Sequence, residues 1–274
     1  MPRKMFCQLG PGAYRLSVWK ERVRRRGRDL FSGERFAGER QAGPLPVCVI
    51  RHNSLIRRRL GNVDMELQEN KAVNLALAVP RVSGILIRPG ETFSFWRLVG
   101  NPSARRGFRE GLTISAGQAR RGMGGGMCQF TNLIHWMVLH TPLTIVEHHH
   151  HDGLDLFPDF NRQIPFGTGT SVYYNYVDYR LRNDTEATYQ LLVWVDGEYL
   201  RGELRSDRPQ RYKYHIRAEG EGFVREEGTV YRVGQVWRET VDPVTGNRVE
   251  RTLLRENHAR VLYDTEGEIQ EKEA

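Results

Sequence analysis

The sequence predicts an α+β fold in which a cysteine-bearing helix packs on a mainly antiparallel sheet, with a basic N-terminal helix and a β-rich C-terminal third. Apolar residues recur at helical spacing within residues 14–30, and a second helix-forming stretch over 127–140 follows a glycine turn. Short strand-like runs separated by turn residues dominate the chain from residue 171 onward. The 274 residues, 39% of them hydrophobic, suffice for one large domain with a smaller appendage.

Residues 1–45 are predicted to form a basic amphipathic segment. Of the formal net charge of +8, residues 1–40 carry most, with 11 Lys and Arg against 4 Asp and Glu. The apolar positions of the predicted helix are Leu16, Trp19, Val23 and Leu30. Three interpretations are open: the helix lies on an anionic membrane surface through residues 15–30, binds nucleic-acid phosphates, or packs on its own domain with a solvated basic face. Nucleic acid is the least favoured partner, because no nucleic-acid motif accompanies the charge.

Residues 46–190 are predicted to form the core domain. A short β-branched run at 47–50 follows a turn-rich connector and predicts a strand. Residues 66–78 predict a helix that Pro80 stops. The stretch 84–95 predicts a strand, a Pro-Gly turn and an alternating strand. Further strands are predicted around the cysteine-bearing helix, at 112–114 and 143–146.

Residues 191–264 are predicted to form a β-rich extension arranged as an antiparallel sheet or meander. Strand-like runs in the last third occupy residues 172–181, 189–195, 199–204, 211–216 and 229–233. Asp196-Gly197 is a hairpin signal, and the turn at 242–246 precedes a last predicted strand pair. The acidic residues 265–274 are predicted to form a frayed tail.

Cysteine content and hydropathy indicate a cytoplasmic protein, placed at the membrane surface if the basic helix binds lipid. The sequence contains no apolar run of at least about 18 residues and no apolar stretch near its start that would serve as a signal peptide. Cys7, Cys48 and Cys128 are odd in number and share no Cys-x-x-Cys spacing, so a disulfide framework is not expected. A reducing compartment fits these residues best.

Cys128 stands where the glycine turn Gly124-Gly125-Gly126 becomes a helix. A thiol at a helix N-terminus experiences the positive end of the helix dipole and nearby free amides, which favour the thiolate and therefore a nucleophile. We expect the glycines and Gln129 to line a substrate pocket, with the amides of Cys128 and Gln129 receiving an oxyanion. Asn132, one turn further along the helix, is placed to orient a substrate.

The run Glu147, His148, His149, His150, His151 and Asp152 supplies candidate bases for this thiol. In an extended backbone alternate residues share a side, so Glu147 lies with His149 and His151, and only one side can face Cys128. His149 or His151 is the predicted base, oriented by Asp178, with Asp152, Asp155 and Asn175 as other candidates. His135 is excluded, because its position along the helix places it roughly 10 Å from Cys128.

Two alternatives to a nucleophile stay open. Cys128 is a small buried residue beside glycines required by close packing, or it is the fourth ligand of a metal bound by the histidines. Adjacent histidines lack the ligand spacing of zinc motifs. No metal and no cofactor are therefore predicted.

With these motifs the chain resembles the VanW family. The matching stretches run in order over roughly residues 60–190. They are residues 68–71 with 74–75, then 86–96, 124–129, 143–147 with His149 and His151, and 178–183.

The resemblance implies a link to the cell envelope and to glycopeptide resistance. The predicted activity is that of a thiol-dependent amidase or acyl transferase on peptidoglycan-precursor peptides, in which Cys128 attacks an amide carbonyl and a histidine removes and returns the proton. Arg88, Arg97 or Arg105 is expected to hold a carboxylate or phosphate of the precursor. The alternative function is a non-catalytic ligand-binding or scaffold protein whose basic helix touches the membrane.

One motif departs from the family pattern. The family usually has Gly-x-Asp-Ala before the strand that follows the histidines, whereas this chain has Gly167-Thr168-Gly169-Thr170. If the family Asp orients the histidine, Gly169 cannot replace it. Three outcomes are then open: Asp178 or Asp152 orients the histidine, this member is catalytically impaired, or the chain has no such triad.

Overall fold

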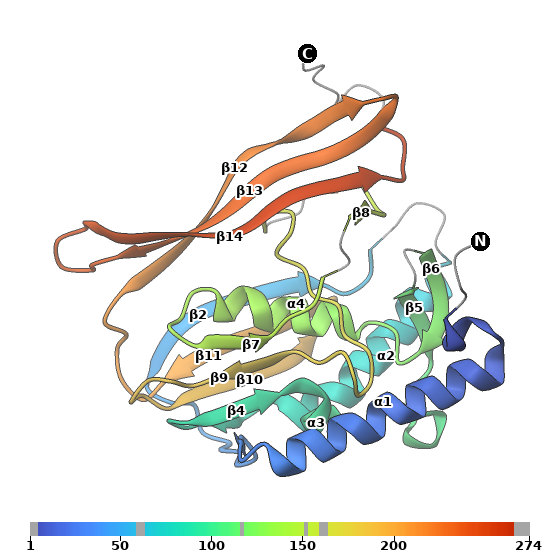
Figure 1. The fold of residues 1–274 in the computed structure, drawn as a ribbon. Helices are drawn as coiled ribbons and strands as arrows, with labels where there is room; N and C mark the ends of the chain where they lie inside the picture. The colour runs from blue at the N-terminus through green and yellow to red at the C-terminus, as the bar shows by residue number, and fades with distance from the viewer. Residues whose placement is uncertain (1–4, 59–63, 116–117, 151–152, 159–163, 266–274) are drawn as a thin grey trace.

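The structure, a computed structural model, describes residues 5–58, 64–115, 118–150, 153–158 and 164–265 (Figure 1). The predicted site residue His151 and the acidic tail from residue 266 onward lie outside the described residues. The α+β fold is confirmed: helices and sheets are both present, and the helix that carries Cys128 packs on an antiparallel sheet.

That antiparallel sheet has the strand order β2-β11-β10-β3. Its strands are β2 (Val47–Leu55), β11 (Tyr199–Ser206), β10 (Tyr189–Asp196) and β3 (Ile85–Ile87). Helix α4 (Met127–Val138) contacts β2 and β11, and α2 (Met65–Val82) contacts β10. A side chain at Gly202 of β11 would come within 2.7 Å of the Met137 methyl group, so glycine permits the close approach of α4 to this strand.

A second small sheet has the order β1-β4-β9-β7. Its members are β1 (Arg35–Phe36), β4 (Glu91–Ser94), β9 (Arg180–Arg182) and β7 (Thr144–Glu147), with β1 parallel to β4 and the other pairs antiparallel. The core between the helices and these sheets is built from fully buried aromatic and aliphatic side chains, including Phe93, Phe95, Phe130 and Leu133. Beside them, β5 (Glu110–Ser115) and β6 (Gln118–Met123) form a hairpin.

The C-terminal strands form the predicted meander. Strands β12 (Lys213–Glu226), β13 (Thr229–Val241) and β14 (Arg248–Val261) are antiparallel neighbours, and β8 (Leu154–Asp155) pairs parallel to β14 (Figure 1). One strand, rather than the predicted pair, follows the turn at 242–246. Strand β10 pairs with β3 and β11 pairs with β2, so the chain up to Ser206 shares one sheet with strands of the predicted core.

Three predicted element boundaries are wrong. Helix α2 continues through Pro80 to Val82: the proline removes one backbone donor, and the Ser83 N–H closes the last turn on the Val79 carbonyl. Phe95 begins α3 (Phe95–Val99) instead of ending a strand, since the Ser94 side chain caps that helix. Only the last two residues of the predicted strand 172–181 lie in β9 (Arg180–Arg182), because the chain turns between Tyr173 and Val177.

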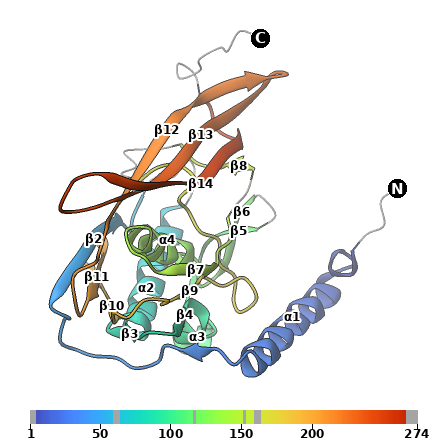
Figure 2. The same cartoon turned by 60° about the vertical axis from the view of Figure 1, so that its left-hand side comes forward.

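Helix α1 (Pro11–Phe31) contains the whole predicted basic helix. It lies along one side of the core, as Figures 1 and 2 show. Short 3-10 turns at Phe6–Gln8 and Ala104–Arg106 complete the helical elements of the described chain. None of the helices in the described part of the chain combines the length and the apolar character that a membrane crossing requires.

Candidate functional site

A cavity of about 1330 Å³ is lined by residues from the core and from the C-terminal sheet. Its wall includes the first turn of α4, part of α2, the hairpin β5–β6, a loop within residues 164–174 and the end of β14. The lining contains the cationic side chains of Arg22, Arg57, Arg58, Lys71, Arg120, Arg121 and Arg255. Asp155 is the one carboxylate that the described residues contribute, so cationic side chains outnumber acidic ones in the wall.

The glycine turn reaches this cavity but is shaped by packing. Gly124 and Gly126 have φ values of 75° and 107°, which disfavour other residues. A Cβ atom at Gly125 would lie 2.3 Å from the carbonyl carbon of Gly111 in β5. The Gly125 carbonyl accepts a hydrogen bond of 2.9 Å from Asn74 of α2. The three glycines therefore line the predicted pocket, and Gly125 also allows the turn before α4 to lie directly against β5.

Cys128 lies in the first turn of α4 and lines the cavity, as the sequence predicts. Burial raises the pKa of its thiol above the ordinary value, although hydrogen bonds from the backbone N–H groups of Val172 and Cys128 oppose this shift. The neutral thiol is therefore the main form at neutral pH, contrary to the thiolate expected at a helix N-terminus. The backbone N–H of Gln129 donates a hydrogen bond to the Gly126 carbonyl at 3.0 Å, so it is not free to bind an oxyanion.

The histidines alternate as predicted, but the opposite set faces the cavity. His149 donates toward Glu147 at 3.1 Å, is exposed and does not line the cavity. His148 and His150 share the other face, with ring centroids 4.2 Å apart, and His150 lines the cavity. The structure therefore does not bring His149 to Cys128, and it places an even-numbered histidine in the cavity wall instead. His151 lies outside the described residues.

His148 connects this segment to the interior of the protein. Its Nε2 donates to the Gly169 carbonyl at 3.0 Å, and its ring stacks on buried His135 with centroids 4.2 Å apart. Burial and the neighbouring His148 and His150 hold the pKa of His135 well below its ordinary value. His135 is therefore neutral, and the Gly169 carbonyl supplies the hydrogen-bond acceptor for His148.

Gln129 and Asn132 use their side chains to hold the fold together. The Gln129 side-chain amide donates to Ser54 Oγ and to the Leu55 carbonyl of β2, both at 2.8 Å. The Asn132 Oδ1 atom accepts from the N–H and the hydroxyl of Thr170, at 2.6 and 2.8 Å. Both residues line the cavity, but these hydrogen bonds fix their side chains to β2 and to the loop that contains Thr170.

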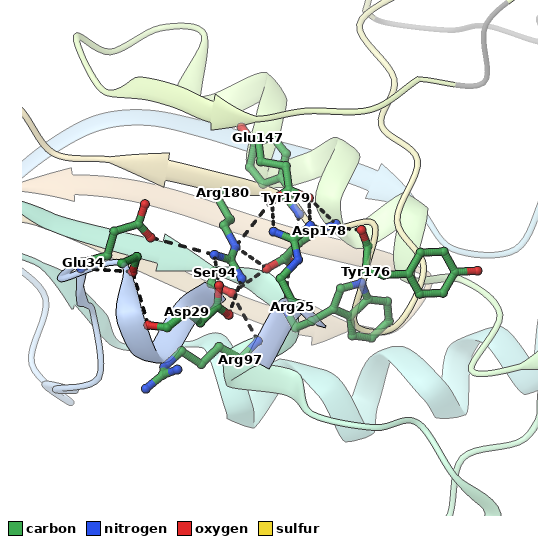
Figure 3. Close-up of polar contacts among 12 residues, drawn as sticks. Arg25, Asp29, Glu34, Ser94, Arg97, Glu147, Tyr176, Asp178, Tyr179 and Arg180 are labelled. Atoms are coloured by element: carbon green, nitrogen blue, oxygen red, sulfur yellow. Dashed lines mark hydrogen bonds and ion pairs between the residues drawn. The ribbon is translucent and has the colours of Figure 1, made fainter. Parts of the chain in front are cut away.

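Asp178 is fully buried in a charged cluster that does not line the cavity (Figure 3). Its carboxylate accepts hydrogen bonds from Ser94 Oγ at 2.5 Å, Arg180 Nε at 2.8 Å and the Trp96 amide at 3.0 Å. Burial raises the pKa of Asp178, and the hydrogen bonds from Ser94 and Arg180 oppose the shift. The predicted triad of Cys128, His149 and Asp178 is therefore not assembled, because Asp178 instead positions Arg180 and the start of α3.

The same cluster holds helix α1 against the core (Figure 3). The Glu147 carboxylate accepts hydrogen bonds from both terminal guanidinium nitrogens of Arg25, each at 2.5 Å. The Asp29 carboxylate accepts hydrogen bonds from both terminal nitrogens of Arg180, at 2.7 and 2.8 Å. Burial opposes ionisation of Glu147, but hydrogen bonds from Arg25 and from the Asp178 amide hold its pKa below the ordinary value. The sequence gives no sign of this cluster, because Arg25 lies within an arginine-rich run of the kind that is usually exposed to solvent.

Arg88 lies away from the cavity and pairs with Glu39 on the surface at 2.6 Å. Arg97 stacks over the Phe36 ring, with its guanidinium carbon 4.4 Å from the ring centroid. Lys71 and Gln68 of α2, which the sequence analysis did not select, line the cavity instead. Within the described residues, no group of three or more His, Cys, Asp and Glu side chains is arranged to hold a metal ion.

Comparison with known proteins gives the family. The family model described as VanW like protein matches residues 70–205. The chain is 36% identical over 230 residues to the Vancomycin B-type resistance protein VanW of Enterococcus faecalis (strain ATCC 700802 / V583), covering 84% of this chain and 83% of that protein. It is 26% identical over 118 residues to the uncharacterized protein YoaR of Bacillus subtilis (strain 168), covering 42% and 36% of the two chains. No solved structure matches. The extent and identity of the Enterococcus match show that this chain belongs to the VanW family.

Proposed function

We propose that this protein contributes to glycopeptide resistance at the cell envelope by holding a peptide ligand in the cavity. The name of the similar Enterococcus protein supports the link to vancomycin resistance. The observation that carries the binding function is the cavity itself, whose volume of about 1330 Å³ exceeds the range of roughly 300–1,000 Å³ for small-molecule sites. A short peptide of the peptidoglycan-precursor type fits such a volume. We place the protein in the cytoplasm, where precursors rather than finished wall are its ligands.

The surroundings of Cys128 favour binding over catalysis. Its thiol is held in the neutral form by burial. His149 pairs with Glu147, and Asp178 pairs with Arg180, so the two predicted partners of a nucleophile are engaged elsewhere. A nucleophilic thiol needs a base within hydrogen-bonding reach and a means of orienting that base.

A cysteine-dependent amidase or acyl transferase is the second candidate, favoured by the presence of Cys128 and His150 in the same cavity wall. The His150 imidazole would take the thiol proton while sulfur attacks the carbonyl carbon of a peptide amide. The C–N bond then breaks, the amine leaves with the proton from the imidazolium, and a thioester forms. Water or a second amine would release the acyl group and regenerate the thiol.

Alkylation of Cys128 as a function of pH separates the two candidates. We expect half-maximal reactivity above the free-cysteine value of about 8.5, because burial disfavours the thiolate. We also expect no change on His150→Ala. Intact-mass and peptide mass spectrometry measure the reaction, with Cys7 and Cys48 as internal comparators. An apparent pKa clearly below that of free cysteine, lost in His150→Ala, would establish the catalytic candidate instead.

Calorimetric titration with a synthetic peptidoglycan-stem pentapeptide tests the binding function directly. We expect the wild-type protein and Cys128→Ala to bind it equally and to leave its mass unchanged, because a neutral thiol in the wall contributes little to affinity. Failure of the wild type to bind the pentapeptide would overturn the proposed ligand class. Cleavage or acyl transfer that disappears in Cys128→Ala would replace binding by catalysis.

A further inference from the structure

Lys71 is a buried lysine at the cavity wall. It is 7% exposed, and its aliphatic stem packs so closely against the start of α4 that a Cβ atom at Gly126 would lie 2.4 Å from Lys71 Cγ. The structure records no hydrogen bond or ion pair to the Lys71 ammonium group among the described residues. A buried ammonium without a counter-charge is costly, which makes this position a strong candidate for an anionic partner.

Gln68 lies one turn before Lys71 on α2 and also lines the cavity. Its side chain is 1% exposed, and its Oε1 atom accepts from the Arg58 amide at 3.3 Å. Its Nε2 atom is buried and has no hydrogen-bond partner within the described part of the chain. Buried amide donors are almost always satisfied, so this N–H group provides a second, independent indication of an acceptor in the cavity.

The start of α4 provides the third component. Gly126 caps this helix with no side-chain hydrogen bond, and the first turn contains no acidic residue. Gly126, Met127 and Cys128 line the same cavity as Lys71 and Gln68. Because the positive end of the helix dipole lies here, a negatively charged group is favoured at this point.

We propose that Lys71, Gln68 and the N-terminal end of α4 bind an anionic oxygen group, a carboxylate or a phosphate, carried by the cavity ligand. This proposal rests on the proposed ligand-binding function and names the chemistry of the ligand. Arg57 and Arg58 reinforce the positive potential, although Arg57 already pairs with Glu69 at 2.6 Å.

The protonation of Lys71 agrees with this role. Burial, together with the charges of Arg57 and Arg58, lowers the pKa of Lys71 to about 7. A bound anion would offset that repulsion and keep the ammonium charged. A bound anion would therefore supply the counter-charge that the Lys71 ammonium lacks among the described residues.

Inorganic phosphate and acetate, titrated separately into the full-length protein and followed by NMR shift changes, test the proposal. We expect one or both to bind, with the preferred ion identifying the ligand group. Lys71→Met keeps the stem that packs on Gly126 and removes the charge, so it should weaken binding at least about tenfold. Lys213→Met, which changes an exposed lysine of β12, is the matched control and should leave binding unchanged.

A second variant keeps the test decisive if Lys71→Met does not fold. Gln68→Glu introduces a carboxylate one turn from Lys71, and we expect it to pair with the ammonium and to abolish phosphate and acetate binding. Equal binding of both ions by all variants, or binding by none, would overturn the anion site. Pentapeptide binding that survives in every variant would then leave the cavity function intact without an anion subsite. Anion binding without pentapeptide binding would support the anion subsite and overturn the proposed peptide ligand.

A second, independent feature is the orientation of helix α1. Its charged residues attach it to the core, and its apolar residues face outward. Arg25 and Asp29 form the buried ion pairs with Glu147 and Arg180, and Arg22 donates to the Tyr174 carbonyl at 3.1 Å. The apolar residues Leu16, Trp19, Val23 and Leu30 are exposed, Trp19 by 61%. Soluble proteins usually bury the apolar face of an amphipathic helix, so this orientation is inverted.

Basic residues flank the outward apolar stripe of α1. Arg15, Lys20, Arg24 and Arg26 are all exposed. The acidic residues of the helix lie elsewhere, with Asp29 bound to Arg180 and Glu21 3.9 Å from Arg24. An apolar stripe bordered by cations matches the boundary between anionic lipid headgroups and acyl chains. We infer that α1 binds an anionic membrane surface, with Trp19 near the headgroups.

Co-sedimentation with vesicles of phosphatidylcholine, alone or with phosphatidylglycerol, tests this surface. We expect binding to the anionic vesicles, which Leu16→Gln, Trp19→Gln and Val23→Gln in combination reduce at least tenfold. The matched control is the pair Val244→Gln and Val249→Gln, which changes exposed valines elsewhere and should have no effect. If the wild type ignores both vesicles but the triple variant converts a dimer to a monomer, the stripe binds a second copy instead and the membrane inference is wrong.

Discussion

Replacing Asp178 by alanine is expected to lower the free energy of unfolding by about 3–5 kcal/mol, because it removes one of the two carboxylates that hold the buried Arg180 guanidinium and leaves the other buried donors of the cluster without their acceptor. The side chain of Asp178 is fully buried, and it also accepts hydrogen bonds from Ser94 and from the Trp96 amide. Chemical denaturation with circular dichroism measures the effect. A large decrease in the free energy of unfolding would show that Asp178 stabilises the fold and the attachment of α1 to the core.

Asp184→Ala is the matched control for Asp178→Ala. Asp184 pairs with Arg182 at 2.6 Å, with the same two-residue spacing as Asp178 and Arg180, but both partners are largely exposed. We expect only a small change in stability for this variant. If Asp178→Ala were as stable as Asp184→Ala yet lost function, Asp178 would have a role in the site that its buried contacts do not indicate.

Gly125→Ala is expected to lower the free energy of unfolding by about 3 kcal/mol, because the new methyl group overlaps backbone rather than a movable side chain. The added Cβ would lie 2.3 Å from the carbonyl carbon and 2.6 Å from the Cα of Gly111, and 2.7 Å from the Leu112 nitrogen. The β5–β6 hairpin must then move away from α4. Thermal unfolding followed by circular dichroism measures the loss.

Gly27→Ala provides the contrasting glycine substitution. Gly27 is a helical residue of α1 with no atom within 4 Å of its ideal Cβ position. We expect it to be neutral or to stabilise the protein by up to about 1 kcal/mol, since alanine has the higher helix propensity. Equal losses for Gly125→Ala and Gly27→Ala would mean that the glycine turn does not pack as tightly as described.

The sequence predicts most of the elements because periodicity and turn residues act locally. The helices at α1, α2 and α4 and the strands β10 to β13 all contain the predicted ranges or most of them. One of the errors occurs where a contact distant in the sequence contributes to the outcome. Trp96, for example, lies in a helix because its amide donates to Asp178, a residue 82 positions away in the chain.

The candidate site shows the same division. Cys128 could be placed at a helix start and in a pocket from the glycine turn alone, and the alternation of the histidines followed from extended backbone. The side of the histidine run that faces the cavity depends on the ion pair between Glu147 and Arg25. The residues next to Glu147 in the sequence do not indicate that pair. Lys71 was missed because a lysine in a helical pattern reads as solvent-facing, whereas Gly126 of a different element buries it.

The cavity wall combines residues from inside and from outside the region that the family model matches. The family match covers residues 70–205 and so includes the glycine turn, Cys128 and Lys71. Arg255, Asn257 and His258 of β14 also line the cavity but lie beyond that region. The cavity wall is therefore built jointly by the family-model region and by the C-terminal sheet. Substitutions in β14 can change the size of the cavity and the groups it offers to a ligand without altering the glycine turn, Cys128 or Lys71.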